Sequence, residues 1–180
     1  MGAEIWLVTG AQAAGKSTVA DLLARSFDRG VHVRGGQFYR WAVRGWAPFD
    51  DPDVPAARRN LALRYRLSRQ AADTYAAAGF TCVVQDNVYG ADVRTWVDAV
   101  QAPVHLVVLR PSVAVLVRRD AARRAATGKV AYGETFTPAD NDRHLATTDP
   151  GLGLWLDTSD HTPEQTVHEV LARAGESLVG

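Results

Sequence analysis

The segment from Gly10 to Ser17 has the residue types and spacing of a loop that binds phosphate groups. It reads Gly-Ala-Gln-Ala-Ala-Gly-Lys-Ser and fits G-x-x-x-x-G-K-[ST] at every fixed position. The glycines allow backbone N–H groups to surround phosphate oxygens, and Lys16 neutralises charge on the β and γ groups during catalysis. The Ser17 hydroxyl is a ligand for magnesium, so the segment predicts a site for ATP with Mg²⁺. The predicted nucleotide-binding residues are Gly10, Ala13, Ala14, Gly15, Lys16, Ser17 and Thr18.

Asp86 is the candidate for the carboxylate that a phosphoryl-transfer site also needs. Such a carboxylate stands at a strand end and holds magnesium, usually through water. Asp86 directly follows the mainly apolar run 81–85, and ligands bind at the carboxyl ends of parallel strands. We therefore expect Asp86 to face the phosphate loop, to bind magnesium and to contribute to catalysis. The alternative is a loop aspartate that caps the helix expected after Gly90.

Arginines gather in the helix expected over residues 112–126. Arg119 and Arg123 are four residues apart and share a helix face. Residues 127–137 lack clear periodicity, so residues 119–140 form a candidate lid. Closure of this lid would bring Arg119 and Arg123 to the triphosphate, where they stabilise charge on the transferring group. The alternative is a solvated arginine face.

The hydrophobic pattern supplies a scaffold that can hold these residues. Short apolar runs predict strands over residues 5–9, 31–33, 81–84, 104–109 and 151–156. Segments with helical spacing cover residues 18–27, 38–43, 56–78, 93–100, 112–126 and 162–174. Strands of this length separated by helices imply βαβ units and a parallel sheet covered on both faces. We expect a single three-layer α/β domain over residues 1–180.

Composition excludes several classes of protein. The 180 residues carry 20 basic and 20 acidic side chains, so net charge gives no support for a nucleic-acid or membrane partner. The one cysteine, Cys82, excludes an internal disulfide. The first residues lack the basic and apolar regions of a secretory leader, and no apolar stretch approaches the roughly 18 residues of a spanning helix. We expect a cytoplasmic protein.

Four segments together resemble the small P-loop kinases, in particular the chloramphenicol phosphotransferase-like group. They are the phosphate loop, the acid after the third strand, the Arg-Arg-Asp-Ala-Ala-Arg-Arg run from Arg118 and the Leu-Trp-Leu-Asp-Thr-Ser run from Leu154. The resemblance implies a five-stranded parallel sheet of order 2-3-1-4-5 and ATP-dependent phosphorylation of a small-molecule hydroxyl. It also implies that Asp157 and Thr158 lie beside the adenine.

One segment departs from the pattern of these kinases. A Gly-Asp-x-Phe-type segment typically ends their second strand, and its aspartate is the proposed base for the accepting hydroxyl. This chain has Gly-Gly-Gln-Phe over residues 35–38, so Gly36 stands in place of the acid. Three explanations stay open. The acceptor is oriented by Asp86 or by one of Asp50, Asp51 and Asp53; a loose transition state needs little help from a base; or the protein binds nucleotide without transferring phosphate.

The segment after the second strand is the expected acceptor side. Aromatic residues crowd between Phe38 and Phe49, which suits an aromatic or largely apolar acceptor. The alternative is that Phe38 and Trp41 only pack a helix on the sheet. The predicted acceptor-binding residues are Arg34, Gln37, Phe38, Arg40 and Trp41. The arginines of the next helix are spread around its circumference and are interpreted as mainly solvated: Arg58, Arg59, Arg64, Arg66 and Arg69.

The sequence therefore predicts a magnesium- and ATP-dependent phosphotransferase that acts on a hydroxyl of a small molecule. Antibiotics and other natural products are among the candidate acceptors. A nucleoside or nucleotide kinase would use the same loop and lid with a more polar acceptor pocket. A nucleotide-binding protein that has lost phosphoryl transfer would account for Gly36.

Overall fold

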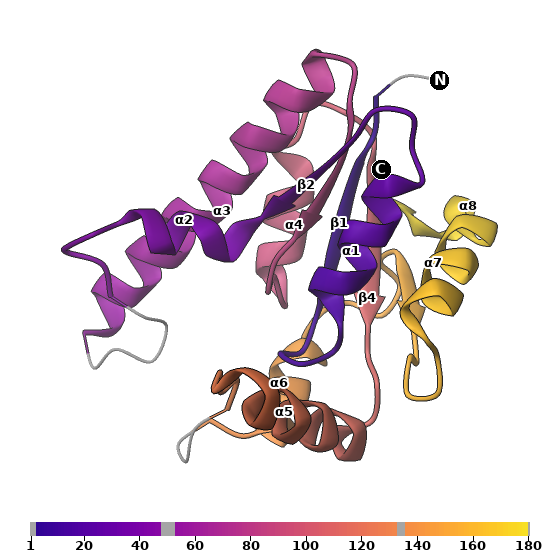
Figure 1. Ribbon diagram of the computed structural model, residues 1–180. Coiled ribbons are helices and arrows are strands. Elements are labelled where there is room, and N and C mark those ends of the chain that lie inside the picture. Colours follow the sequence, from indigo (N-terminus) through magenta and orange to yellow (C-terminus); the bar gives the residue numbers. More distant parts are fainter. Residues whose placement is uncertain (1–2, 48–52, 133–135, 180) are drawn as a thin grey trace.

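A parallel β-sheet lies at the centre of the protein, between helices on both of its faces (Figure 1). This computed structural model describes residues 3–47, 53–132 and 136–179. The main strands run in the order β2-β3-β1-β4-β5, and all neighbours in this order pair in parallel. They are β1 (Ile5–Gly10), β2 (Gly30–Arg34), β3 (Thr81–Gln85), β4 (Val104–Leu109) and β5 (Leu154–Leu156). The predicted α/β fold and strand order are confirmed, and a short β6 (Leu178–Val179) adds to β4 in the antiparallel direction.

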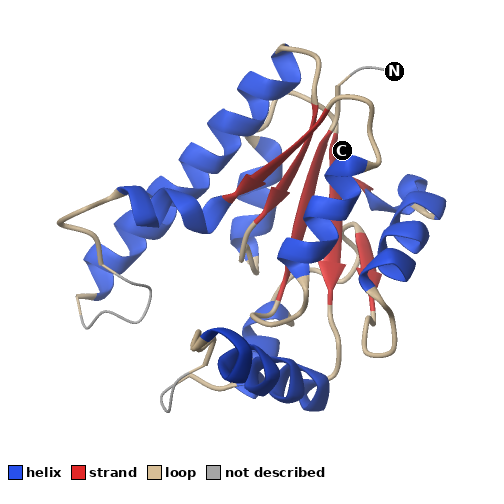
Figure 2. Ribbon diagram, in the orientation of Figure 1, coloured by secondary structure: helices blue, strands red, loops and turns tan. Residues whose placement is uncertain are grey.

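Helices from distant parts of the chain cover the two faces of the sheet (Figure 2). α1 (Lys16–Arg25) and α7 (Pro163–Ala172) share a core with Trp6 and Val8 of β1. α3 (Val54–Ala77) and α4 (Ala91–Asp98) share the other core with Ile5 and Leu7. Alternate residues of a strand point to opposite faces, and burial of both faces leaves β1 buried along its whole length. None of the helices in the described ranges is long and apolar enough to cross a membrane.

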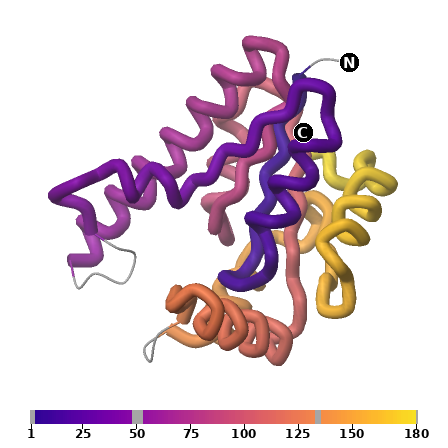
Figure 3. Tube along the Cα trace, viewed as in Figure 1, coloured from indigo at the N-terminus to yellow at the C-terminus, as the bar shows by residue number. Residues whose placement is uncertain are grey.

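The segments that carry the predicted site residues leave the sheet at its carboxyl edge. The phosphate loop follows β1, α2 (Gly35–Trp41) follows β2, and Asp86 follows β3. α5 (Val113–Thr127) and α6 (Pro138–Leu145) pack against each other. Both lie below the carboxyl edge of the sheet and apart from α3 (Figure 3). This edge is the place where doubly wound sheets bind their ligands.

Several elements differ from the sequence-based prediction. α6 and the short α8 (Ala174–Ser177) are not predicted at all, although Pro138 and a capping box between Thr137 and Asp140 mark the start of α6. α2 begins at Gly35 and not at residue 38. β5 begins at Leu154 and not at residue 151, because Gly153 leaves the extended conformation with a φ of 68°.

The contact between Gly35 and Asp86 predicts opposite effects at two adjacent glycines. A Cβ atom at Gly35 would lie 1.8 Å from a carboxylate oxygen of Asp86, whereas a Cβ atom at Gly36 would have no neighbour within 4 Å. Because Asp86 is fully buried, we expect Gly35→Ala to lower the free energy of unfolding by about 2 kcal/mol. Gly36→Ala should leave it unchanged or raise it by up to about 1 kcal/mol. Urea unfolding of both variants measures these changes. Equal losses in the free energy of unfolding would show that Gly35 and Asp86 are not in close contact.

Candidate active site

The phosphate loop joins β1 to α1 in a conformation that its glycines permit. Gly10 has a φ of 143°, and a Cβ atom there would lie 2.3 Å from the carbonyl oxygen of Leu109 on β4. Gly15 has a φ of 97° immediately before α1, and Ala13 has a φ of 63°. These are left-handed or otherwise restricted conformations that favour glycine. The pattern therefore folds as strand, loop and helix, which is the context that phosphate binding requires.

The start of α1 offers hydrogen-bond donors to an anion. Within the described residues, the N–H groups of Gly15, Lys16 and Ser17 have no acceptor. Lys16 Nζ donates to the carbonyl oxygens of Gly10 and Ala11, at 2.7 Å each. Burial, with the nearby charges of Arg64 and Arg123, lowers the pKa of Lys16 to about 7. Free N–H groups at the positive end of a helix, with a lysine beside them, fit the phosphates of a nucleotide.

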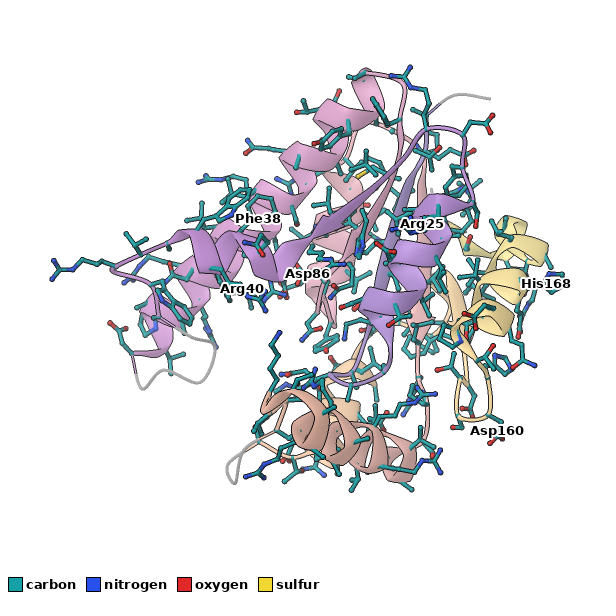
Figure 4. All side chains as sticks on the ribbon, viewed as in Figure 1. Arg25, Phe38, Arg40, Asp86, Asp160 and His168 are labelled. Atoms are coloured by element: carbon teal, nitrogen blue, oxygen red, sulfur yellow. The ribbon has the colours of Figure 1, made fainter. Side chains whose placement is uncertain are left out.

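These donors open into a cavity of about 590 Å³, here called the phosphate cavity. The predicted residues Ala13, Ser17, Thr18 and Gln37 line it. In Figure 4, Arg40 of α2 and Asp86 at the end of β3 lie above the helices α5 and α6. Cations from several elements also line the phosphate cavity: Lys16, Arg34, Arg40, Arg64, Arg119, Arg123 and Lys129. No aspartate or glutamate of the described ranges does so. The cavity therefore suits a ligand with several negative charges.

Arg119 and Arg123 both reach the phosphate cavity from α5, as their shared helix face predicts. Arg119 donates to the carbonyl oxygen of Ala14 at 3.1 Å and to that of Thr158 at 2.8 Å. It thereby connects the phosphate loop with the loop after β5. Arg123 donates to Asp120 at 3.0 Å, and its Nε is buried without a partner among the described residues.

The loop after β5 contains the residues expected beside the adenine. Asp157 lies outside the phosphate cavity and accepts hydrogen bonds from the backbone and the hydroxyl of Ser159. Thr158 is buried, and its hydroxyl has no partner among the described residues. Of the two, Thr158 is therefore the residue with an unused polar group.

Asp86, which the sequence predicts to face the phosphate loop, does not line the phosphate cavity. Its carboxylate is fully buried and forms an ion pair with Arg64, whose Nε donates to Oδ2 at 3.1 Å and whose Nη2 donates to Oδ1. Asn87 N donates to Oδ1 at 2.7 Å. The hydroxyl of Ser17 donates instead to Gln85 Oε1, at 3.0 Å. Successive strand residues point in opposite directions, so the side chain that reaches Ser17 belongs to Gln85 and not to Asp86.

Arg64 is the functional candidate that the sequence analysis missed. The interpretation of Arg64 as solvated is wrong, because its side chain is only 13% exposed, and burial lowers its pKa. Its guanidinium also lies over the ring of Tyr39, 4.9 Å from the centroid. The sequence contains the partner acid, Asp86, directly after β3. It does not show that the two residues pair, because that depends on how α3 crosses β3.

A second cavity of about 730 Å³, here called the acceptor cavity, lies beside the first. It shares Gln12, Arg64 and Asn87 with the phosphate cavity. Its aromatic walls are Tyr39, Trp46, Tyr65, Tyr89 and Phe136. The two cavities therefore meet at a small set of polar side chains.

The aromatic residues proposed from sequence for the acceptor wall are placed differently. Phe38 packs against the core and meets Trp41 edge to face, with ring centroids 5.2 Å apart. Neither residue lines the phosphate or the acceptor cavity, whereas Tyr39 and Trp46 do line the acceptor cavity. Residues three apart share a face of α2, so Trp41 contacts Phe38, but Trp41 is 65% exposed and covers Phe38 from the solvent side. Of the alternative aspartates, Asp53 caps α3, and Asp50 and Asp51 lie outside the described residues.

Hydrogen bonds tie α6 and Tyr132 to the phosphate loop. Asn141 Oδ1 on α6 accepts from Gln12 N at 2.7 Å, and Asn141 Nδ2 donates to the hydroxyl of Tyr89 at 3.2 Å. Tyr89 in turn donates to the carbonyl oxygen of Gly10 at 2.9 Å, and Tyr132 donates to that of Gln12. Gln12, Tyr89 and Asn141 also line the acceptor cavity. One network therefore holds the phosphate loop and builds the acceptor wall.

The parallel sheet of order 2-3-1-4-5 with helices on both faces, and the loop after β1, give this chain the fold that solved P-loop kinases share. The family model described as an AAA domain matches residues 5–136, and the chain belongs to this family. A search of the curated proteins gives no match.

Several solved structures share the fold at low sequence identity. A sugar kinase from Janibacter sp. is 17% identical with a TM-score of 0.68, over 98% of this chain and 96% of that one. The tunicamycin resistance protein of Deinococcus radiodurans is 15% identical with a TM-score of 0.66, over 100% and 99%. The APS kinase of Mycobacterium tuberculosis, in complex with AMPPNP and APS, is 19% identical with a TM-score of 0.64, over 95% and 96%.

The ion pair between Arg64 and Asp86 predicts a large loss of stability when one partner is removed. Arg64→Leu leaves a buried carboxylate without its counter-charge, and we expect the free energy of unfolding to fall by about 3–5 kcal/mol. Arg66→Leu on the same helix is the matched control, because Arg66 is exposed; it should change the value by less than about 0.5 kcal/mol. Urea unfolding measures both, and a small loss for Arg64→Leu would show that the pair does not hold Asp86.

The lowered pKa of Lys16 predicts that nucleotide binding takes up a proton. Above about pH 7 the nucleotide-free protein holds Lys16 largely neutral, while phosphate oxygens favour the charged form. Uptake should be near zero at about pH 6 and approach one proton per site at about pH 8.5. Calorimetric titration of AMPPNP in buffers of different ionisation enthalpy measures it. Lys16→Met should abolish the uptake and Lys129→Met should not; uptake that persists in Lys16→Met would refute the assignment.

Proposed function

We propose that the protein transfers a phosphoryl group from ATP to a hydroxyl group of a small molecule held in the acceptor cavity. The observation that carries this proposal is the meeting of the two cavities at Gln12, Arg64 and Asn87. A cationic cavity with a phosphate loop on one side and an aromatic cavity on the other provide separate places for donor and acceptor. Positioning the two against each other is the main requirement of phosphoryl transfer.

The donor side of the site fits a magnesium-bound triphosphate. Lys16 and the free N–H groups of α1 would hold the phosphates, and Arg119 and Arg123 would stabilise charge on the transferring group. Magnesium, when bound, neutralises phosphate charge. The oxygen ligands that this chain offers beside the loop are the hydroxyl of Ser17 and the amide oxygen of Gln85. Asp86 is directed at Arg64, so we assign its main role to holding that arginine.

Arg64 would act between donor and acceptor. It lines both cavities, and its guanidinium is held by two hydrogen bonds that it donates to Asp86. A cation at this junction stabilises negative charge on the phosphoryl group as it passes to the hydroxyl. Gly36, at the start of α2, supplies no carboxylate to act as a base for the accepting hydroxyl. A loose transition state develops little charge on the attacking oxygen, so the hydroxyl proton can leave late, to the transferred phosphate or to water.

The acceptor cavity favours a hydroxyl compound with a planar or apolar body. Tyr39 and Trp46 stack with ring centroids 5.5 Å apart, and rings of this kind recognise aromatic and sugar ring faces. Antibiotics and other natural products fit this description, in line with the resemblance to chloramphenicol phosphotransferase-like kinases. The neighbours named as a sugar kinase and a tunicamycin resistance protein support small hydroxyl acceptors. A nucleoside would also place its base on these rings.

The proposal predicts magnesium-dependent release of ADP that rises when the right acceptor is present. The panel would contain amphenicols, aminoglycosides, nucleoside antibiotics, ordinary nucleosides, nucleotides and sugars, with mass spectrometry to identify a phosphorylated product. Lys16→Ala should abolish release. Arg123→Ala should lower kcat by about 100-fold or more while changing the Kd for ATP much less, because its charge acts on the transferring group.

Two outcomes would contradict the proposal. Tight binding of magnesium and ATP with no acceptor-dependent release across the panel would favour a protein that has lost transfer, as Gly36 allows. Equal effects of Arg123→Ala on kcat and on ATP binding would remove the lid arginine from catalysis.

A further inference from the structure

A third cavity, of about 800 Å³, lies between α3 and α4. It is lined by Arg58, Arg59, Arg66 and Arg69, and we call it the arginine groove. The sequence-based interpretation that the arginines of α3 are too widely spread to act together is wrong for these four. Positions separated by three, four, seven or eight residues return to the same side of a helix, and α4 closes the other side of the groove through Thr95 and Trp96.

The groove arginines differ from most other arginines on the helices of this protein. Arg25, Arg94 and Arg173 each form an ion pair with an acid three or four residues away. Within the described residues, no carboxylate pairs with any of the four arginines of the groove. Their donors are free, and four like charges in one groove repel each other until an anion binds between them.

The arginine groove is continuous with the acceptor cavity. Both cavities have Leu61, Tyr65 and Asp92 in their walls. Tyr65 is held in place by a hydrogen bond from its hydroxyl to the carbonyl oxygen of Asn87, at 2.5 Å. The N-terminal half of α3 extends beyond the sheet beside α2, so the groove lies next to the acceptor side of the molecule (Figure 1).

We propose that the arginine groove binds phosphate groups of an extended acceptor whose hydroxyl end lies in the acceptor cavity. This inference rests on the proposed function and names its acceptor class, a hydroxyl compound that already carries one or more phosphate esters. Arginine is the side chain best suited to phosphate, because its planar donors bind two oxygens at once. From Arg58 to Arg69 the helix rises by about 16 Å, which is enough for more than one phosphate.

Asp92 gives the bound acceptor a direction. It lies where the arginine groove meets the acceptor cavity and is the one acid in the wall of either among the described residues. A carboxylate at this point repels phosphate and can accept a hydrogen bond from a neutral hydroxyl. The phosphate end of the acceptor is thus kept on α3, and the hydroxyl end enters the acceptor cavity.

Phosphate esters of this kind come from two sources, a small phosphorylated molecule or a short single strand of nucleic acid. Binding would be measured on the full chain with saturating magnesium and AMPPNP, which blocks the phosphate cavity. The probes are inorganic tripolyphosphate and a labelled hexathymidylate. The test variant is Arg66→Gln with Arg69→Gln. The matched control is Arg25→Gln with Arg94→Gln, which makes the same change of charge on exposed helix surfaces outside the groove.

We expect at least one probe to bind, and we expect the groove variant to weaken that binding about tenfold or more at low salt. For hexathymidylate the slope of log K against log salt should fall by about two. The control variant should change neither the affinity for the probe nor the salt dependence of its binding. Binding of tripolyphosphate alone identifies a small phosphorylated acceptor, and binding of hexathymidylate identifies a strand. In the ADP-release assay the groove variant should raise KM for phosphate-bearing acceptors and leave kcat unchanged.

Failure of both probes to bind, or equal losses in the groove and control variants, would overturn the proposal. Binding of AMPPNP in the same titration separates this result from failure of the proposed function. If AMPPNP binds and neither probe does, only the groove assignment fails. If AMPPNP does not bind while the groove variant alone loses the probe, the groove stands and the kinase proposal fails.

Discussion

The buried ion pair between Arg64 and Asp86 is the interaction on which the arrangement of the site depends. A buried charge is tolerated only with a partner, and this pair places an acid from the end of β3 against an arginine of α3, in the space that Gly35 leaves open. The pair thereby fixes β3, α2 and α3 relative to one another at the carboxyl edge of the sheet. Because Arg64 lines both cavities, the contact that stabilises the fold also places a cation between the phosphate cavity and the acceptor cavity.

The lid and the acceptor wall share a second constraint. Asn141, Tyr89 and Tyr132 use their side chains to satisfy backbone groups of the phosphate loop. Two of these side chains also line the acceptor cavity. An acceptor that pressed on Asn141 or Tyr89 would therefore act directly on the loop that holds the nucleotide, with no long path between the two sites. Under the proposed function, coupling of donor and acceptor binding would follow from these shared side chains and would not require a large domain movement.

The sequence predicted the fold and the phosphate loop because both depend on local patterns. The alternation of strands and helices predicted the parallel sheet, the resemblance to small P-loop kinases implied its strand order, and the shared face of Arg119 and Arg123 followed from their spacing. Asp86 was predicted to face the phosphate loop, but the side chain that contacts Ser17 is that of Gln85, because neighbouring strand residues point in opposite directions. On α2 each residue turns the side chain by about 100°, and Tyr39, not Phe38, lines the acceptor cavity. Arg64 depends on the crossing of α3 and β3, which no local pattern contains.

Net charge concealed the main electrostatic feature of the molecule. Equal numbers of acidic and basic residues gave no support for a nucleic-acid or membrane partner, yet charge is unevenly distributed. Four arginines that pair with no carboxylate of the described residues line the arginine groove, and Arg40 lines the phosphate cavity. A protein with no net charge can therefore present cationic surfaces at the phosphate cavity and on α3, separated by the aromatic acceptor cavity and by Asp92. Charge that is separated in this way selects ligands by where their charges lie, because attraction at one end and repulsion at the junction set the direction of binding.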